Sequence, residues 1–194
     1  DNTAAFGSSG QLDGYIDMSA LGRYELDPQR ADFEFLLSVM GHELMHQWAS
    51  FLTFIDGAGV RSEALLGKDG SHWSDLLSTQ ASVIYVHDWQ DNEDGTFRSL
   101  ATRKFFSQLD LYVAGLLETD QVEPLLLIDS PGHDVAVVPT PNQVVAGTSS
   151  LITIDQIIAA EGPRIPPSSA SPRDFKIAFL LLTGPGEEAA PGVT

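Results

Sequence analysis

The stretch DFEFLLSVMGHELMHQWASF spans residues 32–51 and contains the pattern His-Glu-x-x-His at residues 42–46. Apolar residues of this stretch and the following Leu52 recur at steps of three and four, as in a buried amphipathic helix; they are Leu36, Leu37, Met40, Leu44, Trp48, Phe51 and Leu52. Asp27 or Asp32 can cap the start of this helix, and Asp56-Gly57 predicts where it ends.

Residues four apart on a helix lie on one face, so His42 and His46 can direct two imidazole nitrogens at one metal ion. Glu43 is adjacent and could take a proton from a water on that metal. Two nitrogen ligands, a carboxylate base and an open position are what a zinc hydrolase needs. The alternative is a core helix in which these buried polar side chains have protein partners.

The segment GHELMHQW at residues 41–48 resembles the active-site helix of the zincin metallopeptidases. Two later motifs, GSHWS at 70–74 and LDLY at 109–112, resemble those of a little-characterised group of secreted bacterial zincins. The resemblance implies a secreted zinc-dependent endopeptidase with a cleft between two subdomains. The expected fold is α+β and zincin-like, with the active-site helix packed against a mixed sheet and a second helix and further strands C-terminal to it.

A catalytic zinc normally has three protein ligands and a water, and two residues could supply the third ligand. His72 lies in a loop bounded by Gly and Ser, and imidazole suits zinc. Asp110 lies in the first turn of a helix that Ser107 would cap, but its spacing to Tyr112 is Asp-x-Tyr, whereas zincins with an Asp ligand have Asp-x-x-Tyr. The sequence favours His72 and keeps Asp110 open; one could bind zinc while the other orients a ligand.

The expected reaction is hydrolysis of a peptide bond by a metal-activated water, with Glu43 as general base. Candidates for stabilising the oxyanion are Tyr112, Tyr85 and His87, although a core position suits His87 better. A rival is a non-catalytic zincin-like module of an extracellular or surface assembly. Its structural metal would be closed by four ligands: His42, His46, His72 and Asp110. A third possibility is a hydrolase that acts on a non-peptide bond.

The turn DNEDGT at residues 91–96 resembles part of a calcium loop. The first and twelfth positions of that loop would be Gln90 and Ala101, where carboxylates are required, so an EF-hand is excluded. A looser Ca²⁺ site remains open, using Asp88, Asp91 or Asp94.

The composition predicts one acidic globular domain. The chain of 194 residues has 27 acidic and 10 basic residues, a net charge of −17 and no cysteine. This charge argues against binding nucleic acid or anionic membranes, and no apolar run is long enough to insert into a membrane. The expected partners are a protein or peptide substrate and other domains or chains of a larger secreted protein, of which this chain would be a processed piece or fragment.

Other patterns predict the remaining elements. A hairpin has Asp94-Gly95 at its tip, and two helices start at the caps Ser107 and Thr153, the latter in a capping box with Gln156. The predicted strands are 13–19, 81–89, 96–100, 124–129, 133–139 and 175–184.

Overall fold

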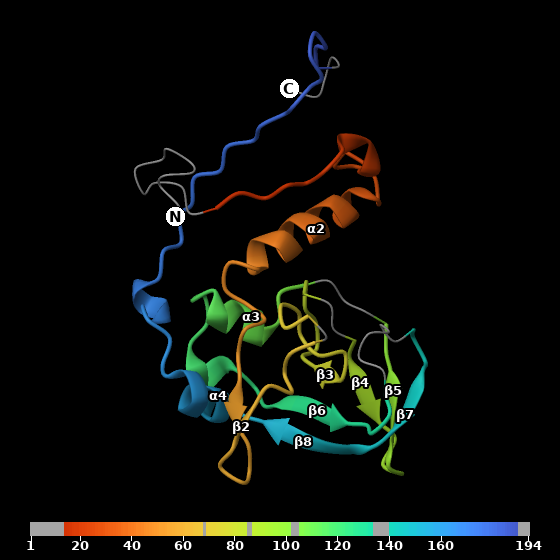
Figure 1. The fold of residues 1–194 in the computed structure, drawn as a ribbon, viewed down its shortest axis with the longest axis vertical. Coiled ribbons are helices and arrows are strands. Elements are labelled where there is room, and N and C mark those ends of the chain that lie inside the picture. Colours follow the sequence, from red (N-terminus) through yellow and green to blue (C-terminus); the bar gives the residue numbers. More distant parts are fainter. Residues whose placement is uncertain (1–13, 68, 85–86, 102–104, 134–139, 190–194) are drawn as a thin grey trace.

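The computed structural model describes residues 14–67, 69–84, 87–101, 105–133 and 140–189 (Figure 1). The described helices are η1 (Leu21–Arg23), α2 (Phe33–Met45), α3 (Gln108–Val113), η2 (Thr119–Gln121), α4 (Ile154–Glu161) and η3 (Ser168–Ala170). The described strands are β1 (Phe54–Ile55), β2 (Arg61–Ser62), β3 (Leu77–Ser78), β4 (Trp89–Asp91), β5 (Thr96–Ser99), β6 (Leu125–Asp129), β7 (Val144–Ala146) and β8 (Thr148–Ile152).

The strands form three small antiparallel sheets, with orders β1-β2, β3-β6-β8 and β4-β5-β7. The α+β class is therefore as predicted. The expected mixed sheet is wrong for the described residues, because none of their strand pairs is parallel. A parallel pair needs a long crossover connection, whereas β1-β2 and β4-β5 are joined directly by short turns. No described helix is long and apolar enough to cross a membrane.

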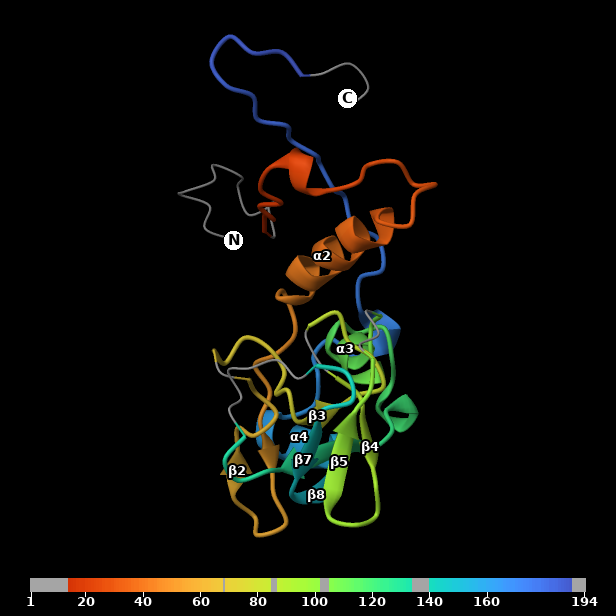
Figure 2. The ribbon, with the colours of Figure 1, turned by 90° about the vertical axis from the view of Figure 1, so that its right-hand side faces the viewer.

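The main core lies between sheet β3-β6-β8 and helices α3 and α4. Leu77 and Leu127 pair across β3 and β6 and are buried. They belong to the same cluster as Leu109 of α3 and Ile157 of α4. Figures 1 and 2 show α3 between the sheets and α2, so this core supports the end of α2 that carries the HExxH pattern.

Local signals predicted both short helices correctly. The Ser107 hydroxyl accepts the Asp110 N–H at 3.0 Å, and Asp110 in return accepts the Ser107 N–H at 2.8 Å. Thr153 and Gln156 form the corresponding capping box at the start of α4. Each box satisfies backbone N–H groups that the first turn of a helix leaves without partners.

The β4-β5 hairpin is also confirmed, with Gly95 at φ 83° in its turn. The strand predicted for residues 81–89 is wrong for its described residues before Trp89. The Ser82 hydroxyl accepts the Ile84 N–H at 3.0 Å, which bends the chain into a turn. The apolar side chains of Val83 and Ile84 are buried, but they belong to a turn and not to a paired strand.

Helix α2 is shorter and more exposed than its sequence predicts. It ends at Met45, long before Asp56-Gly57, and Ser50 follows at φ 67°. Met45 is its one buried residue, whereas Leu37 and Leu44 remain 52% and 42% exposed. None of the described strands packs extensively against α2, so the predicted helix-on-sheet packing is not found there. Both views place α2 beyond the sheets, with α3 in between (Figures 1 and 2).

Two further predicted strands do not form. Residues 14–19 and 175–184 pair with no described strand, and Phe179 and Leu180 are 80% and 87% exposed. An apolar segment becomes a stable strand only beside a neighbour that takes up its backbone hydrogen bonds. The strand predicted at 133–139 lies outside the described residues, except for His133.

Candidate metal centre

The two histidines of the HExxH pattern lie one turn apart at the C-terminal end of α2. His42 is within the helix and His46 is its C-cap residue. Their Nε2 atoms are 3.2 Å apart and their rings stand at 86° to each other. Both side chains are half-buried, so both nitrogens can face a ligand that enters from solvent.

A tight loop after β2 brings a third histidine to this pair. The Gly67 N–H donates to the His72 carbonyl oxygen at 2.7 Å, beside an isolated bridge between Leu66 and Trp73. A Cβ at position 67 would lie 2.8 Å from the Trp73 carbonyl oxygen, so this close approach requires glycine. The loop places His72 Nε2 at 3.2 Å from His42 Nε2.

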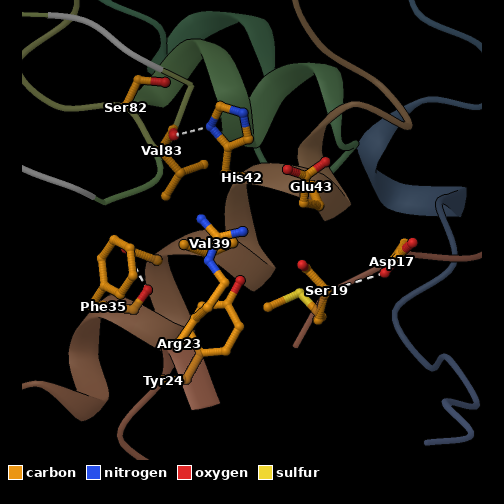
Figure 3. A pocket seen from close by; sticks show the side chains of 12 residues that line it. Asp17, Ser19, Arg23, Tyr24, Phe35, Val39, His42, Glu43, Ser82 and Val83 are labelled. Carbon is orange, nitrogen blue, oxygen red and sulfur yellow. Dashed lines mark hydrogen bonds between the residues drawn. The ribbon is translucent and has the colours of Figure 1, made fainter. Parts of the chain in front are cut away.

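Hydrogen bonds at the opposite ring nitrogen fix the tautomers of two of these histidines. His42 Nδ1 lies 2.8 Å from the carbonyl oxygen of Val83 (Figure 3), which can only accept, so Nδ1 carries the proton. His72 Nδ1 lies 2.7 Å from Asp69 Oδ2, which is also an acceptor. When neutral, the two rings therefore turn Nε2 lone pairs toward each other at 3.2 Å. That contact is repulsive unless a proton or a metal cation lies between the nitrogens.

Burial and hydrogen bonding keep the surrounding groups in the states that a metal ion requires. Burial lowers the pKa of His46, and the nearby His42 and His72 lower it further. The Ser71 N–H donates to Asp69 at 3.0 Å, and this bond, with those from His72, lowers the pKa of Asp69 to about 2. Near neutral pH, His46 is thus an uncharged donor and Asp69 is an anion.

The spacing of the three nitrogens fits a metal ion. The ligand atoms of His42, His46 and His72 all lie within 4.8 Å of one another. Two nitrogens bound at ~2.05 Å to a tetrahedral ion would lie ~3.3 Å apart, close to the two separations of 3.2 Å here. In the part of the chain that the structure describes, no Asp, Glu or further His joins the group. These three residues could therefore hold a metal ion and leave a position for water or substrate.

A pocket opens beside this group. Its volume is about 270 Å³, enough space for one amino-acid side chain. Glu43, which is exposed, lies next to His42 at its wall (Figure 3). The lining residues are Asp17, Met18, Ser19, Arg23, Tyr24, Phe35, Ser38, Val39, His42, Glu43, Ser82 and Val83. A substrate residue in this pocket would lie against both the carboxylate and the first histidine.

Comparison of the chain with protein-family models, with curated proteins and with solved structures gives no significant match. Its chemistry is therefore inferred from the arrangement of its own side chains.

The structure brings His72, and not Asp110, to the HExxH pair. Asp110 is completely buried in α3, where its Oδ1 accepts the Trp73 Nε1–H at 3.0 Å and its Oδ2 accepts the Ser107 N–H at 2.8 Å. Tyr112 is 6% exposed and packs in the main core. Asp110 and Tyr112 of the LDLY motif are thus both buried in the interior of the protein.

Neither of the oxyanion candidates that the structure describes, Tyr112 and His87, lines the pocket. His87 is buried, and burial lowers its pKa, but it neither joins the metal-binding group nor lines the pocket. Tyr112 does not line the pocket either. Tyr85 lies outside the described residues.

In the acidic turn proposed as a calcium site, two carboxylates accept hydrogen bonds from backbone N–H groups of the same turn. Asp91 accepts the Glu93 N–H at 2.8 Å, and Asp94 accepts the Thr96 N–H at 3.0 Å. Asp88 accepts the Ser78 hydroxyl at 3.4 Å. Within the described ranges, the carboxylates of this turn do not come together as a group of three ligands. The hydrogen bonds of Asp91 and Asp94 are those of an ordinary polar turn.

Sequence reasoning missed the two acceptors that orient the histidines. Asp69 precedes His72 by one turn of the loop, and Asp-x-Ser is a common turn in which the side chain binds its own backbone. That signal could have identified Asp69. The Val83 carbonyl belongs to the backbone, so no residue type at this position reveals its role.

Proposed function

We propose that this protein is a secreted, zincin-like, zinc-dependent endopeptidase, with His42, His46 and His72 as zinc ligands and Glu43 as general base. The observation that carries the proposal is the convergence of three Nε2 atoms beside a glutamate at the wall of a pocket. Imidazole suits zinc, and three protein ligands leave a position for water. The HExxH spacing is typical of metalloproteases.

Each residue of the site has a distinct task. The Val83 carbonyl orients His42, and the Asp69 carboxylate orients His72 and strengthens it as a donor. When bound, zinc supplies an acidified water and a Lewis acid for the scissile carbonyl. Glu43 takes the proton of the attacking water and passes it to the leaving amine. The pocket beside Glu43 holds a substrate side chain next to the reacting bond.

The rival function, a binding module with a structural metal, requires a fourth protein ligand to close the site. Asp110 was the candidate for that ligand, and both of its oxygens are occupied by Trp73 and Ser107. The group in the described residues has three members. This supports an open, catalytic site. A hydrolase of non-peptide bonds would use the same residues, and its substrate would distinguish it.

The Glu43→Gln variant tests the proposal. It should bind one zinc per chain, as the parent does, and lose about 10²- to 10⁴-fold in turnover of a quenched fluorescent peptide library. Glu34→Gln is the matched control, because Glu34 is an exposed glutamate in the first turn of the same helix. It should cleave at the parent rate.

Peptide cleavage by Glu43→Gln at the parent rate would contradict the role of Glu43. A parent protein that binds zinc, cleaves no peptide and hydrolyses esters or amides of other kinds would support the non-peptide alternative. A zinc-loaded parent without any hydrolytic activity would support the binding module.

A further inference from the structure

A completely buried carboxylate, that of Asp110, lies behind the three histidines and not among them. Its Oδ1 accepts the indole N–H of Trp73 at 3.0 Å, and its Oδ2 accepts the backbone N–H of Ser107 at 2.8 Å. The Ser82 hydroxyl lies beside the same carboxylate and helps to lower its pKa. Trp73 and Ser82 are each 1% exposed and Ser107 is 3% exposed, so water cannot easily replace any of these bonds.

Two of these partners adjoin groups of the metal centre. Trp73 directly follows His72, and the bridge between Trp73 and Leu66 shapes the His72 loop. Ser82 directly precedes Val83, whose carbonyl oxygen receives the His42 Nδ1–H. One carboxylate on α3 therefore connects the segment that carries one histidine with the segment that orients another.

We propose that Asp110 is a positioning residue that holds the His72 loop and the Val83 carbonyl together, so that the three nitrogens are arranged for metal before it binds. This inference rests on the metal-binding part of the proposed function. Metal ligands need supporting groups that lock their orientation, because a ligand on a loose loop must be ordered at the expense of affinity. Here both supported segments are loops, and α3 is the regular element behind them.

The chemistry of this position favours a carboxylate for a reason other than helix capping. Gln156, a neutral amide, completes the box of α4, so a cap alone does not require a charge. Asp110 receives one donor at each oxygen, from Trp73 and Ser107, with the Ser82 hydroxyl beside them, and only a carboxylate offers two acceptor oxygens. Burial raises the pKa of Asp110, and the bonds from Ser107 and Trp73, with the nearby Ser82 hydroxyl, oppose that rise. An unpaired carboxylate would not be tolerated here, so these bonds must persist.

The test compares zinc dissociation constants of full-length variants, measured by competition with a chelating dye. Asp110→Asn places an amide N–H₂ against one of the donors, and Trp73→Phe removes the indole N–H while keeping an aromatic ring. Each should weaken zinc binding about 10- to 100-fold, the range found for groups behind metal ligands. Because the two residues share one bond, the double variant should bind zinc no more weakly than the worse single variant.

Thr153→Ala is the matched control, because it breaks the capping box of α4 and leaves the site untouched. It should lower the melting temperature of the metal-free protein and leave the zinc dissociation constant within about twofold of the parent value. The visible spectrum of the Co²⁺-loaded protein adds a second readout of ligand geometry. It should change in Asp110→Asn and Trp73→Phe and remain parental in Thr153→Ala.

Parental zinc affinity and a parental Co²⁺ spectrum in Asp110→Asn, or in Trp73→Phe if the former does not fold, would overturn the positioning role. The role would also be overturned if Thr153→Ala lost as much zinc affinity as Asp110→Asn at the same loss of melting temperature. General destabilisation would then explain the result. In either case zinc binding and peptide cleavage by the parent would leave the proposed function standing. A parent that binds no zinc would instead refute that function, and the positioning role with it.

Discussion

Removal of the Asp69 carboxylate should weaken metal binding without removing a metal ligand. Asp69 Oδ2 accepts the His72 Nδ1–H at 2.7 Å, and its other oxygen accepts the Ser71 N–H at 3.0 Å. The carboxylate therefore holds both the ring and the loop that carries it. Asp69→Ala leaves the His72 ring to rotate and removes the negative charge that strengthens its Nε2 as a donor.

The size of the effect follows from the exposure of this pair. Groups that orient metal ligands are typically worth about 10- to 100-fold in affinity. The Asp69 side chain is 41% exposed and that of His72 is 24% exposed, so water can replace the lost acceptor and salt screens the charge. We therefore expect the low end of the range, about tenfold or ~1.4 kcal/mol of binding free energy. Asp69→Asn keeps one acceptor oxygen for two donors and should fall between Ala and the parent.

The assay is zinc competition at pH 7.5, with Asp120→Ala as control. Asp120 is an exposed carboxylate in η2, so this variant removes the same charge away from the site. It should bind zinc as the parent does. Zinc affinity of Asp69→Ala equal to that of Asp120→Ala would refute the reasoning, because the carboxylate would then contribute only to the net charge.

Two further predictions concern pH and the His72 loop. Because the folded-state pKa of His46 is lowered, the unfolded chain, with an ordinary histidine pKa near ~6.5, takes up a proton first as the pH falls. The metal-free protein should therefore lose stability as the pH falls from about 7 toward that lowered pKa. Urea midpoints at pH 8 and pH 5.5 measure this loss, which should shrink in His46→Asn; an unchanged difference would assign it to other groups. Gly67→Ala should weaken zinc binding more than Gly57→Ala, because a Cβ at position 67 meets the Trp73 carbonyl oxygen at 2.8 Å and one at position 57 meets nothing within 4 Å; equal affinities would show that the loop gives way without moving His72.

The sequence predicted those elements whose signals are local. The Ser107-Asp110 and Thr153-Gln156 spacings place side-chain oxygens against the backbone N–H groups of their own first turns. The Asp94-Gly95 turn provides the positive φ that its hairpin needs. In each case the interacting groups lie within a few residues, so propensity and spacing suffice.

Elements that depend on distant partners could not be predicted in the same way. Residues 175–184 are predicted to form a central strand, yet no described strand pairs with them. The apolar period of α2 continues past Met45, where the chain instead turns toward β1. Periodicity states that a segment has an apolar face, but the element that covers this face is a property of the tertiary structure.

The choice between His72 and Asp110 shows where spacing reaches its limit. A carboxylate at the third position of a helix that begins with Ser is already engaged at one oxygen by the cap. If Asp110 Oδ2 bound a metal, the buried Ser107 N–H would lose its acceptor. If Oδ1 bound the metal, the Trp73 indole N–H would lose its acceptor. Either loss is costly in the core. His72 loses no bond of its Nδ1 when its Nε2 turns to the metal. The free energy of unsatisfied buried donors therefore favours histidine as the ligand and the carboxylate as its support.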